Sequence, residues 1–364
     1  MKKIYSSLGL MSGTSGDGVD SSVIKSDGED QILIENNEYN AYPVEISDEI
    51  HKIREKIQIA TDLNNFKTEI NKLSEKLTDF HAAIANKIIK KNNIDIIGFH
   101  GQTIFHNSDE KISRQIGNGD KLSKLTQKPV IYDFRQNDLK NGGEGAPLAP
   151  IYHKAIIKNL DKKNKIKLPL IILNIGGIAN ITVINENYKI NSMDIGPGNC
   201  MIDKWIRLNS DKKIDENGNL AKLGKIDKFI LNQSLDNYNY NKVSKKKSLD
   251  TNDFDIFFAK GLSLKNGAAT ITEFTADILS RRLFNFKIYI CGGGRKNTFL
   301  IQRLESKLKN KVILIDKIGF DGDFIESQAF AYLAIRSLLK LPISFPETTG
   351  CIKPCTGGKL SKNF

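Results

Sequence analysis

Residues 8–24 read LGLMSGTSGDGVDSSVI, and this stretch decides the fold that we expect for the chain. Two runs that alternate apolar and small or polar residues flank a glycine-rich segment, Gly13–Gly18. Such alternation is typical of β-strands, and glycine with small polar residues favours the turn between them. The sequence therefore predicts strand, loop, strand. Three uses of the loop are open at this point: a tight hairpin turn, a metal site, or a cradle for phosphate.

The segment Gly13–Gly18 has the glycine spacing of a P-loop without its chemistry. Val19 and Asp20 follow it, where a P-loop needs lysine and then serine or threonine. The spaced carboxylates of a calcium loop are missing too. Backbone N–H groups beside glycine can approach an anion closely, and the hydroxyls of Thr14 and Ser15 can donate to phosphate oxygens. The alternative is an ordinary hairpin turn.

The loop also offers two carboxylates, Asp17 and Asp20. Either could hold Mg²⁺ directly or through water. We assign the metal to Asp17, and the sequence leaves Asp20 open as the alternative.

The opening pattern recurs about half a chain later. Residues 168–184, LPLIILNIGGIANITVI, again give a strand, a turn at Gly176 and Gly177, and a second strand. A third glycine-rich turn begins at Gly292 and Gly293, after a short apolar strand and before a helix. Three such turns at strand ends indicate nucleotide binding. The repeat indicates a duplicated fold of two similar halves with a cleft between them.

The rest of the pattern is that of an α/β protein, in which helices alternate with short apolar strands. We expect an N-terminal domain over residues 1–165 with substrate-binding segments, a nucleotide-binding domain over 166–345, and a loop-like tail over 346–364. A charged, loop-like run over 159–167 marks the boundary. Helices are predicted over 66–91, 254–280, 299–308 and 324–339, and strands over 94–99, 129–134, 286–290 and 312–315.

Polar residues follow two of these strands. His100 and Gln102 come after the strand over 94–99, and Arg135 and Asp138 come after the strand over 129–134. Ligands of open α/β sheets bind beyond the carboxyl ends of strands, so we predict that these four side chains contact the substrate. Arg135 could pair with a substrate carboxylate; the alternative is a salt bridge with Asp133 or Asp138.

Asp194 is the candidate general base. It opens the motif DIGPGN, residues 194–199, whose Gly-Pro-Gly turn would fix a carboxylate at a strand end. The alternative is a turn or helix-capping aspartate.

The four cysteines do not suggest a disulfide scaffold or a metal site. Cys351 and Cys355 lack a second pair of ligands at zinc spacing, so we do not expect a metal there. The five histidines form no i, i+4 metal pair, and His81 is expected to pack beside a helix core.

The formal net charge of +12 does not indicate nucleic-acid binding. Lysines are dispersed, and the densest runs, residues 162–165 and 245–247, are expected in loops without aromatic residues that could stack on bases. No apolar run reaches membrane-spanning length, and the N-terminus lacks the features of a signal peptide. We therefore expect a cytoplasmic protein that binds neither membrane nor nucleic acid.

Taken together, these segments resemble the anhydro-N-acetylmuramic acid kinase family, in order from residue 9 to residue 338. Two departures are visible: Gly16 stands where the family commonly has methionine, and Ile195 where it commonly has threonine. The matching stretches are GLMSGTSGDGVD, GFHGQTIFH, DFRQNDLKNGGEGAPLAP, LNIGGIANIT, DIGPGNCMIDKW, CGGGRKNTFLIQRL and GFDGDFIESQAFAYLAIRSL.

The resemblance implies two duplicated actin-like (ribonuclease H-like) ATPase domains that close over ATP, with Mg²⁺ as cofactor. The implied reaction opens the 1,6-anhydro ring of anhydro-N-acetylmuramic acid with water and phosphorylates the freed 6-oxygen. It gives N-acetylmuramic acid 6-phosphate and ADP, in the recycling of cell-wall (peptidoglycan) sugar. A homodimer is an expectation drawn from the family alone.

On this interpretation Asp194 activates the water and Arg135 holds the lactyl carboxylate of the sugar. Two alternatives are another sugar kinase on the same fold and a non-catalytic sugar or nucleotide sensor. The residues expected at ATP are Gly13, Thr14, Ser15, Gly16, Asp17, Gly18, Val19, Asp20, Gly176, Gly177, Gly292 and Gly293.

Overall fold

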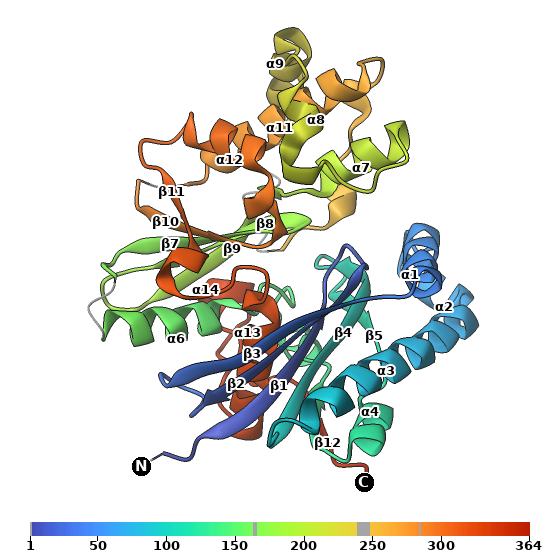
Figure 1. Cartoon of the computed structure of the whole chain (residues 1–364), viewed down its shortest axis with the longest axis vertical. Coiled ribbons are helices and arrows are strands. Elements are labelled where there is room, and N and C mark those ends of the chain that lie inside the picture. The colour runs from blue at the N-terminus through green and yellow to red at the C-terminus, as the bar shows by residue number, and fades with distance from the viewer. Residues whose placement is uncertain (1, 163–165, 239–247, 284) are drawn as a thin grey trace. The chain divides into compact units, whose positions relative to one another are not determined.

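The computed structural model describes residues 2–162, 166–238, 248–283 and 285–364. The chain folds into two compact α/β units (Figure 1). Unit 1 comprises Met1–Ile166 and Phe324–Phe364, and unit 2 comprises Lys167–Asp323. Of the two lysine runs predicted as loops, residues 163–165 of the first and the whole of the second, 245–247, lie outside the described residues.

Unit 1 is a seven-stranded sheet with helices around it. Its strands are β1 (Tyr5–Ser12), β2 (Gly18–Ser26), β3 (Ile32–Ala41), β4 (Ile96–Asn107), β5 (Ile112–Ile116), β6 (Val130–Tyr132) and β12 (Lys359–Ser361). Its helices are α1 (Val44–Lys56), α2 (Asp62–Asn65), α3 (Lys67–Ile89), α4 (Gly119–Thr126), α5 (Gln136–Lys140), α6 (Pro150–Asp161), α13 (Ile325–Leu338) and α14 (Pro346–Thr349).

Unit 2 has a five-stranded sheet. Its strands are β7 (Leu170–Ile175), β8 (Ile178–Ile184), β9 (Ile190–Pro197), β10 (Lys287–Cys291) and β11 (Val312–Leu314). Its α-helices are α7 (Cys200–Asn209), α8 (Asn219–Lys222), α9 (Lys228–Asn237), α11 (Leu264–Ser280) and α12 (Thr298–Glu305). Its described 3₁₀ turns are η1 (Glu216–Gly218), η2 (Thr251–Asp253), η3 (Phe257–Ala259), η4 (Gly293–Lys296) and η5 (Ile315–Ile318).

The two sheets repeat one topology, which confirms the predicted duplication. In unit 1 the order is β3-β2-β1-β4-β6, with β2 antiparallel to both neighbours and β1, β4 and β6 parallel. In unit 2 the order is β9-β8-β7-β10-β11, with β8 antiparallel to both neighbours and the other pairs parallel. This is the strand order of the actin-like (ribonuclease H-like) fold, which the resemblance led us to expect.

Two glycines let α13 lie directly on the sheet of unit 1. A Cβ atom on Gly9 of β1 would lie 1.9 Å from the carbonyl oxygen of Ser327, and one on Gly98 of β4 would lie 2.2 Å from that of Phe330. Residues alternate faces along a strand, so the neighbours Leu8 and Leu10 face the other way. They belong to the apolar core that α1 and α3 complete.

The position of α13 is one difference from the predicted domains. The sequence pattern placed residues 324–339 in the second domain, but α13 packs on β1, β2 and β4 of unit 1. The tail over 346–364 is not only loop. It contains α14, and its strand β12 pairs antiparallel with β6, so the end of the chain completes the sheet of unit 1.

Three local predictions also need correction. The helix predicted over 254–280 begins only at Leu264, where Ser263 caps it through the N–H of Asn266. The run over 159–167 is not wholly loop, because α6 continues to Asp161. The strand predicted to end at 99 continues to Asn107, because its second half pairs with β5. The long helix predicted over 66–91 is confirmed as α3.

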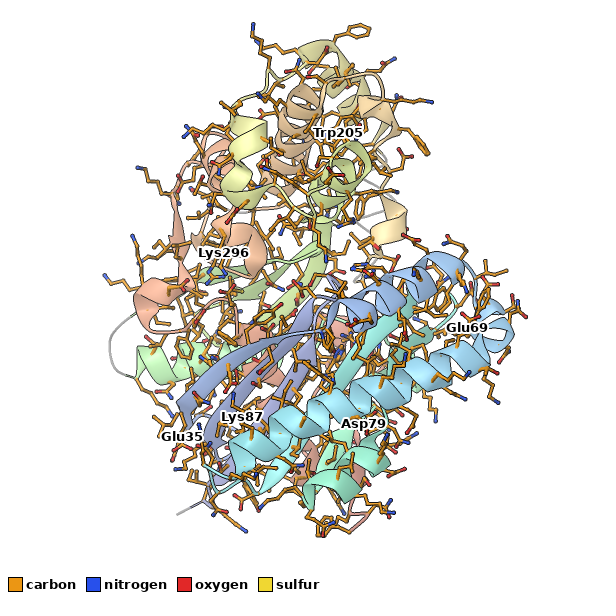
Figure 2. All side chains as sticks on the ribbon, turned by 45° about the vertical axis from the view of Figure 1, so that its right-hand side comes forward. Glu35, Glu69, Asp79, Lys87, Trp205 and Lys296 are labelled. Carbon is orange, nitrogen blue, oxygen red and sulfur yellow. The ribbon has the colours of Figure 1, made fainter. Side chains whose placement is uncertain are left out.

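The core of unit 2 forms between its sheet and the helices α7 and α11. Trp205 of α7, labelled in Figure 2, is buried in it and donates from Nε1 to the carbonyl of Leu264 over 2.9 Å. Gly267 leaves room for this ring, since a Cβ there would lie 2.1 Å from it. In neither unit is any described helix both long and apolar enough to cross a membrane.

Candidate functional site

The loop that opened the sequence joins β1 to β2 in unit 1. The N–H of Gly16 donates to the carbonyl of Gly13 over 3.1 Å, which closes a turn. Gly16 has φ of +65°, in the left-handed region that favours glycine, and a Cβ there would meet Ile50. Gly13 differs: the nearest heavy atom to a Cβ there is Ser15 Oγ, at 3.8 Å. The Gly13 face of the loop is therefore open enough for a ligand to lie against it.

A buried polar network fixes the start of this loop. Gln102 is fully buried and donates from Nε2 to the carbonyl of Gly13 over 3.0 Å, while its Oε1 accepts from Ser12 Oγ. The hydroxyl of Tyr42 donates to Ser12 Oγ over 3.0 Å. Because Gln102 exposes no surface, its geometry favours a role in holding the loop over the predicted contact with substrate.

Helix α1 supports the loop from the side, a contact that the sequence pattern did not reveal. Ser47 Oγ donates to the carbonyl of Gly16 over 2.9 Å, and the Arg54 guanidinium donates to the carbonyl of Thr14. Arg54 places a positive charge beside the predicted phosphate site. Arg54 lies 40 residues after Thr14 in the sequence, so only the folded structure brings its guanidinium to the loop.

The two loop carboxylates have different surroundings. Asp17 is exposed, and its Oδ1 accepts from Ser15 Oγ over 2.7 Å, while its backbone carbonyl accepts from the N–H of Tyr42 over 2.9 Å. Asp20 lies within β2 and is partly buried. Burial, with the negative charges of Asp17 and Asp20, raises the pKa of Tyr39 to about 12. The same negative potential would attract a cation. Because Asp17 is exposed and Asp20 is partly buried, Asp17 is the more accessible of the two carboxylates.

His100 and Arg135 form a pair in unit 1. Arg135 donates from Nη2 to His100 Nε2 over 3.0 Å and from Nη1 to the carbonyl of Gly145 over 2.8 Å. His100 is buried, and its Nδ1 lies 2.8 Å from the carbonyl of Gly101. Burial first, and then the positive charge of Arg135, lower the pKa of His100 well below its usual value. A neutral imidazole that accepts from Arg135 orients the guanidinium.

Both aspartates considered as partners of Arg135 hold other groups. Asp133 pairs with Lys359 of β12 over 2.9 Å. Asp138 is almost fully buried, and its Oδ2 accepts from the N–H of Gly145 over 2.7 Å, while its Oδ1 accepts from Thr349 Oγ1 over 2.6 Å. These bonds favour a role for Asp138 in holding the loop that follows α5 over the predicted contact with substrate.

In unit 2 the predicted residues Gly176, Gly177 and Asp194 lie at one end of the sheet. The N–H groups of Gly198 and Asn199 donate to the carbonyls of Gly177 and Gly176 over 2.9 and 2.8 Å. A Cβ on Gly198 would lie 2.2 Å from the Gly176 carbonyl. The Gly-Pro-Gly turn that follows Asp194 is thus docked on the Gly176–Gly177 turn.

Asp194 lies in β9 and is mostly buried, with 8% of its surface exposed. Its Oδ2 accepts from the backbone N–H of Leu249 over 2.7 Å. A buried carboxylate with one oxygen fixed in this way is oriented, as a general base requires.

In the third glycine turn, after β10, a side chain would be strained at Gly292 but would fit at Gly293. Gly292 has φ of +81°, and a Cβ there would lie 2.3 Å from Asn174 Oδ1. At Gly293, no described atom outside this residue and its two chain neighbours lies within 4 Å of where a Cβ would be, so its face is open. Behind the turn, Arg295 contacts the carboxylates of Asp316, Asp321 and Asp323. Lys296, labelled in Figure 2, pairs with Asp323 over 2.7 Å. The ion pairs hold η4 against the segment before α13.

These residues offer the kinds of group that bind ATP and Mg²⁺ in a kinase: backbone surfaces, hydroxyls and a carboxylate. Gly13 and Gly293 offer open backbone surfaces, Thr14 and Ser15 offer exposed hydroxyls, and Asp17 offers an oxygen ligand of the kind that Mg²⁺ prefers.

The sequence model of the family described as "Anhydro-N-acetylmuramic acid kinase" matches residues 5–362. A protein of that name from Pelagibacter ubique is 49% identical over 379 aligned positions that cover 100% of both chains. Another from Rhodospirillum rubrum is 37% identical over 359 positions, covering 96% of this chain and 92% of that protein.

One solved structure is a more distant match. The activator of the 2-hydroxyisocaproyl-CoA dehydratase from Clostridium difficile aligns with a TM-score of 0.42 and 12% identity, over 91% of this chain and 94% of that one. By the match over residues 5–362 and the identity to full-length relatives, this chain belongs to the anhydro-N-acetylmuramic acid kinase family.

Proposed function

We propose that this protein uses ATP and water to convert anhydro-N-acetylmuramic acid into N-acetylmuramic acid 6-phosphate and ADP. The observation that carries the proposal is the family match over residues 5–362, which includes every predicted site residue. The geometry adds that both units present glycine turns at strand ends, where nucleotides bind in this class of fold. The biological role that corresponds to this reaction is the recycling of cell-wall sugar.

The reaction balances as one hydrolysis and one phosphoryl transfer. The oxygen of water attacks the anomeric carbon, and the bond from that carbon to the 6-oxygen breaks. The water gives one proton to the Asp194 carboxylate, which later releases it to solvent. The freed 6-oxygen attacks the γ-phosphorus of ATP, and ADP leaves. A base is needed because neutral water is a weak nucleophile.

The first loop is proposed to hold the phosphates. Its backbone amides, the hydroxyls of Thr14 and Ser15 and the guanidinium of Arg54 are suited to the charge on the transferring phosphoryl group. Mg²⁺, which Asp17 would hold, supplies further neutralisation of phosphate charge. On the sugar side, the Arg135 guanidinium is proposed to pair with the lactyl carboxylate. Its hydrogen bond to the neutral imidazole of His100 fixes its orientation.

The test compares two sugars under identical conditions. Purified protein is incubated with ATP, Mg²⁺ and either anhydro-N-acetylmuramic acid or glucose, and ADP release is followed. We expect ADP release with the anhydro sugar alone, with one N-acetylmuramic acid 6-phosphate formed for each ADP. In H₂¹⁸O the label should enter the anomeric hydroxyl. Turnover on glucose but not on the anhydro sugar would instead identify an ordinary sugar kinase, and binding without turnover would identify a sensor.

A further inference from the structure

Two cysteines and an aspartate meet inside unit 1. One ligand atom from each of Asp138, Cys351 and Cys355 lies within 4.8 Å of the other two. All three residues are buried, with 1%, 1% and 7% of their surfaces exposed. We call these three residues the Cys-Asp cluster. Sequence patterns do not reveal this cluster, because Asp138 is more than 200 positions from either cysteine.

The surroundings fix one oxygen of Asp138 and turn the other towards the thiols. Oδ2 accepts from the N–H of Gly145 over 2.7 Å. Oδ1 lies 2.6 Å from Thr349 Oγ1 and 3.9 Å from Cys355 Sγ. Cys355 Sγ also lies 3.0 Å from Ser344 Oγ. Asp138 and Cys355 therefore have polar neighbours, in contrast to the apolar surroundings in which a lone cysteine usually packs.

The separation of Cys355 Sγ and Asp138 Oδ1 is close to that in a tetrahedral zinc site, and all three ligand atoms lie within 4.8 Å of one another. With Zn–S of about 2.3 Å and Zn–O of about 2.0 Å, a tetrahedral angle separates sulfur and oxygen ligands by roughly 3.5 Å. The observed 3.9 Å between Cys355 Sγ and Asp138 Oδ1 needs to contract by only a few tenths of an ångström. Thiolates are ligands that select soft or borderline cations, so Mg²⁺ and Ca²⁺ are poor occupants.

We propose that the Cys-Asp cluster binds one thiophilic divalent cation, Zn²⁺, through two thiolates and one carboxylate, with water at the fourth position. Binding releases the two thiol protons to solvent and involves no change of oxidation state. Three negative ligands exceed the charge of the cation by one. The Lys111 ammonium, which donates to the carbonyls of Gly142 and Gly143 over 3.1 Å each, provides positive charge on the neighbouring loop.

The cation would join α5, through Asp138, to the tail after α14, through Cys351 and Cys355, which are four residues apart. Cys355 also forms an isolated β-bridge with Ser344. Asp138 holds Gly145, and the carbonyl of Gly145 accepts from Arg135. The proposed site is thus a structural support beneath the Arg135 loop. It does not depend on the proposed reaction.

The test measures zinc directly. Full-length protein is reduced, stripped with a chelator, dialysed to equilibrium against micromolar Zn²⁺ with excess Mg²⁺, and analysed for metal by mass spectrometry. We expect about one Zn²⁺ per chain, and its loss in the double variant Cys351→Ser, Cys355→Ser. The matched control, Cys200→Ser in unit 2, should keep the full amount.

A second measurement uses the unaltered protein, so that a folding defect of the double variant cannot decide the result. Zn²⁺ should slow alkylation of Cys351 and Cys355 by N-ethylmaleimide by at least tenfold, read by peptide mass spectrometry, and leave the rate at Cys200 unchanged. Less than about 0.1 Zn²⁺ per reduced chain, or equal alkylation rates with and without Zn²⁺, overturns the proposal. A Cys351–Cys355 disulfide in protein that takes up no zinc after reduction also overturns it and would identify a redox pair.

Discussion

The Asp194 carboxylate holds the backbone at Leu249 and is also the proposed general base. Its Oδ2 accepts a hydrogen bond from the N–H of Leu249, and asparagine keeps an oxygen that can accept the same bond. Asp194→Asn should therefore fold normally and lose only the ability to take a proton. We expect kcat to fall by roughly 10²–10⁴-fold, the usual contribution of a general base, with ATP affinity changed less than twofold.

Steady-state kinetics and calorimetric titration of ATP separate these two effects. Asn180→Ala, on the neighbouring strand β8 opposite Asp194, is the matched control for disturbance of the sheet. A parallel loss of ATP affinity and kcat in Asp194→Asn would make Asp194 structural or a metal ligand.

The two carboxylates of the first loop can be distinguished by the same approach. Asp17 is exposed at the turn, whereas Asp20 lies within β2 between β1 and β3. Asp17→Asn should raise the Mg²⁺ concentration for half-maximal turnover about tenfold, which corresponds to about 1.4 kcal/mol of lost interaction. The measurement is a Mg²⁺ titration at saturating ATP, with Asp20→Asn as the paired variant. A shifted curve for Asp20→Asn and an unchanged curve for Asp17→Asn would move the metal to Asp20.

At the scale of the element, the contact between β1 and α13 sets a strict limit on side-chain size. A Cβ on Gly9 would overlap backbone atoms of α13, at 1.9 Å from the Ser327 carbonyl and 2.7 Å from the Ala331 nitrogen. Because a backbone cannot rotate away as a side chain can, Gly9→Ala should lower the free energy of unfolding by about 1–3 kcal/mol or more. Urea unfolding followed by circular dichroism gives this value.

Gly293→Ala is the matched control, since a Cβ there meets no described atom beyond its chain neighbours within 4 Å. Its stability should change by less than about 0.5 kcal/mol. If ATP lies against this turn, the same variant should raise the KM for ATP. A Gly9→Ala variant as stable as Gly293→Ala would show that α13 does not pack as described.

Sequence alone predicts those elements whose pattern is local. The 3- and 4-residue spacing of apolar side chains predicts α3, and the glycine turns between apolar runs predict the β1–β2 and β7–β8 hairpins. The placement of α13 is not local. Its pattern shows a helix, but its fit against Gly9 and Gly98 depends on residues more than 200 positions earlier.

The same distinction holds for the site. The glycines and acidic residues of the first loop are visible as a motif, and the family resemblance adds their expected roles. The support from Ser47, Arg54 and Tyr42 depends on tertiary contacts and leaves no sequence spacing to recognise. Gln102 shows the converse: its position after an apolar run predicts a ligand contact, whereas its burial in a network indicates support for the loop.

At the scale of the whole molecule, the two units share a topology but differ in titratable groups. All five histidines, at positions 51, 81, 100, 106 and 153, belong to unit 1, and unit 2 has none. Three of them are buried. Burial lowers the pKa of His81 to about 4 and that of His153 to about 3, and burial with the charge of Arg135 lowers the pKa of His100 well below its usual value.

These shifts predict that mild acid weakens unit 1 selectively. A lowered pKa means that the unfolded chain binds more protons than the native state below pH 6.5, so stability is full above that pH and falls as pH decreases. At pH 5.5 each buried histidine should lower the free energy of unfolding by about 1.4 kcal/mol relative to pH 7.5, or by about 4 kcal/mol for the three.

The single tryptophan, Trp205, lies in the core of unit 2 and reports on that unit alone (Figure 2). Urea unfolding at both pH values should therefore show a nearly constant midpoint for Trp205 fluorescence, while the circular dichroism signal gains an earlier transition at pH 5.5. His153→Gln, which cannot take up a proton there, should reduce that pH effect by about one third; equal acid shifts for both signals would show that the units unfold as one.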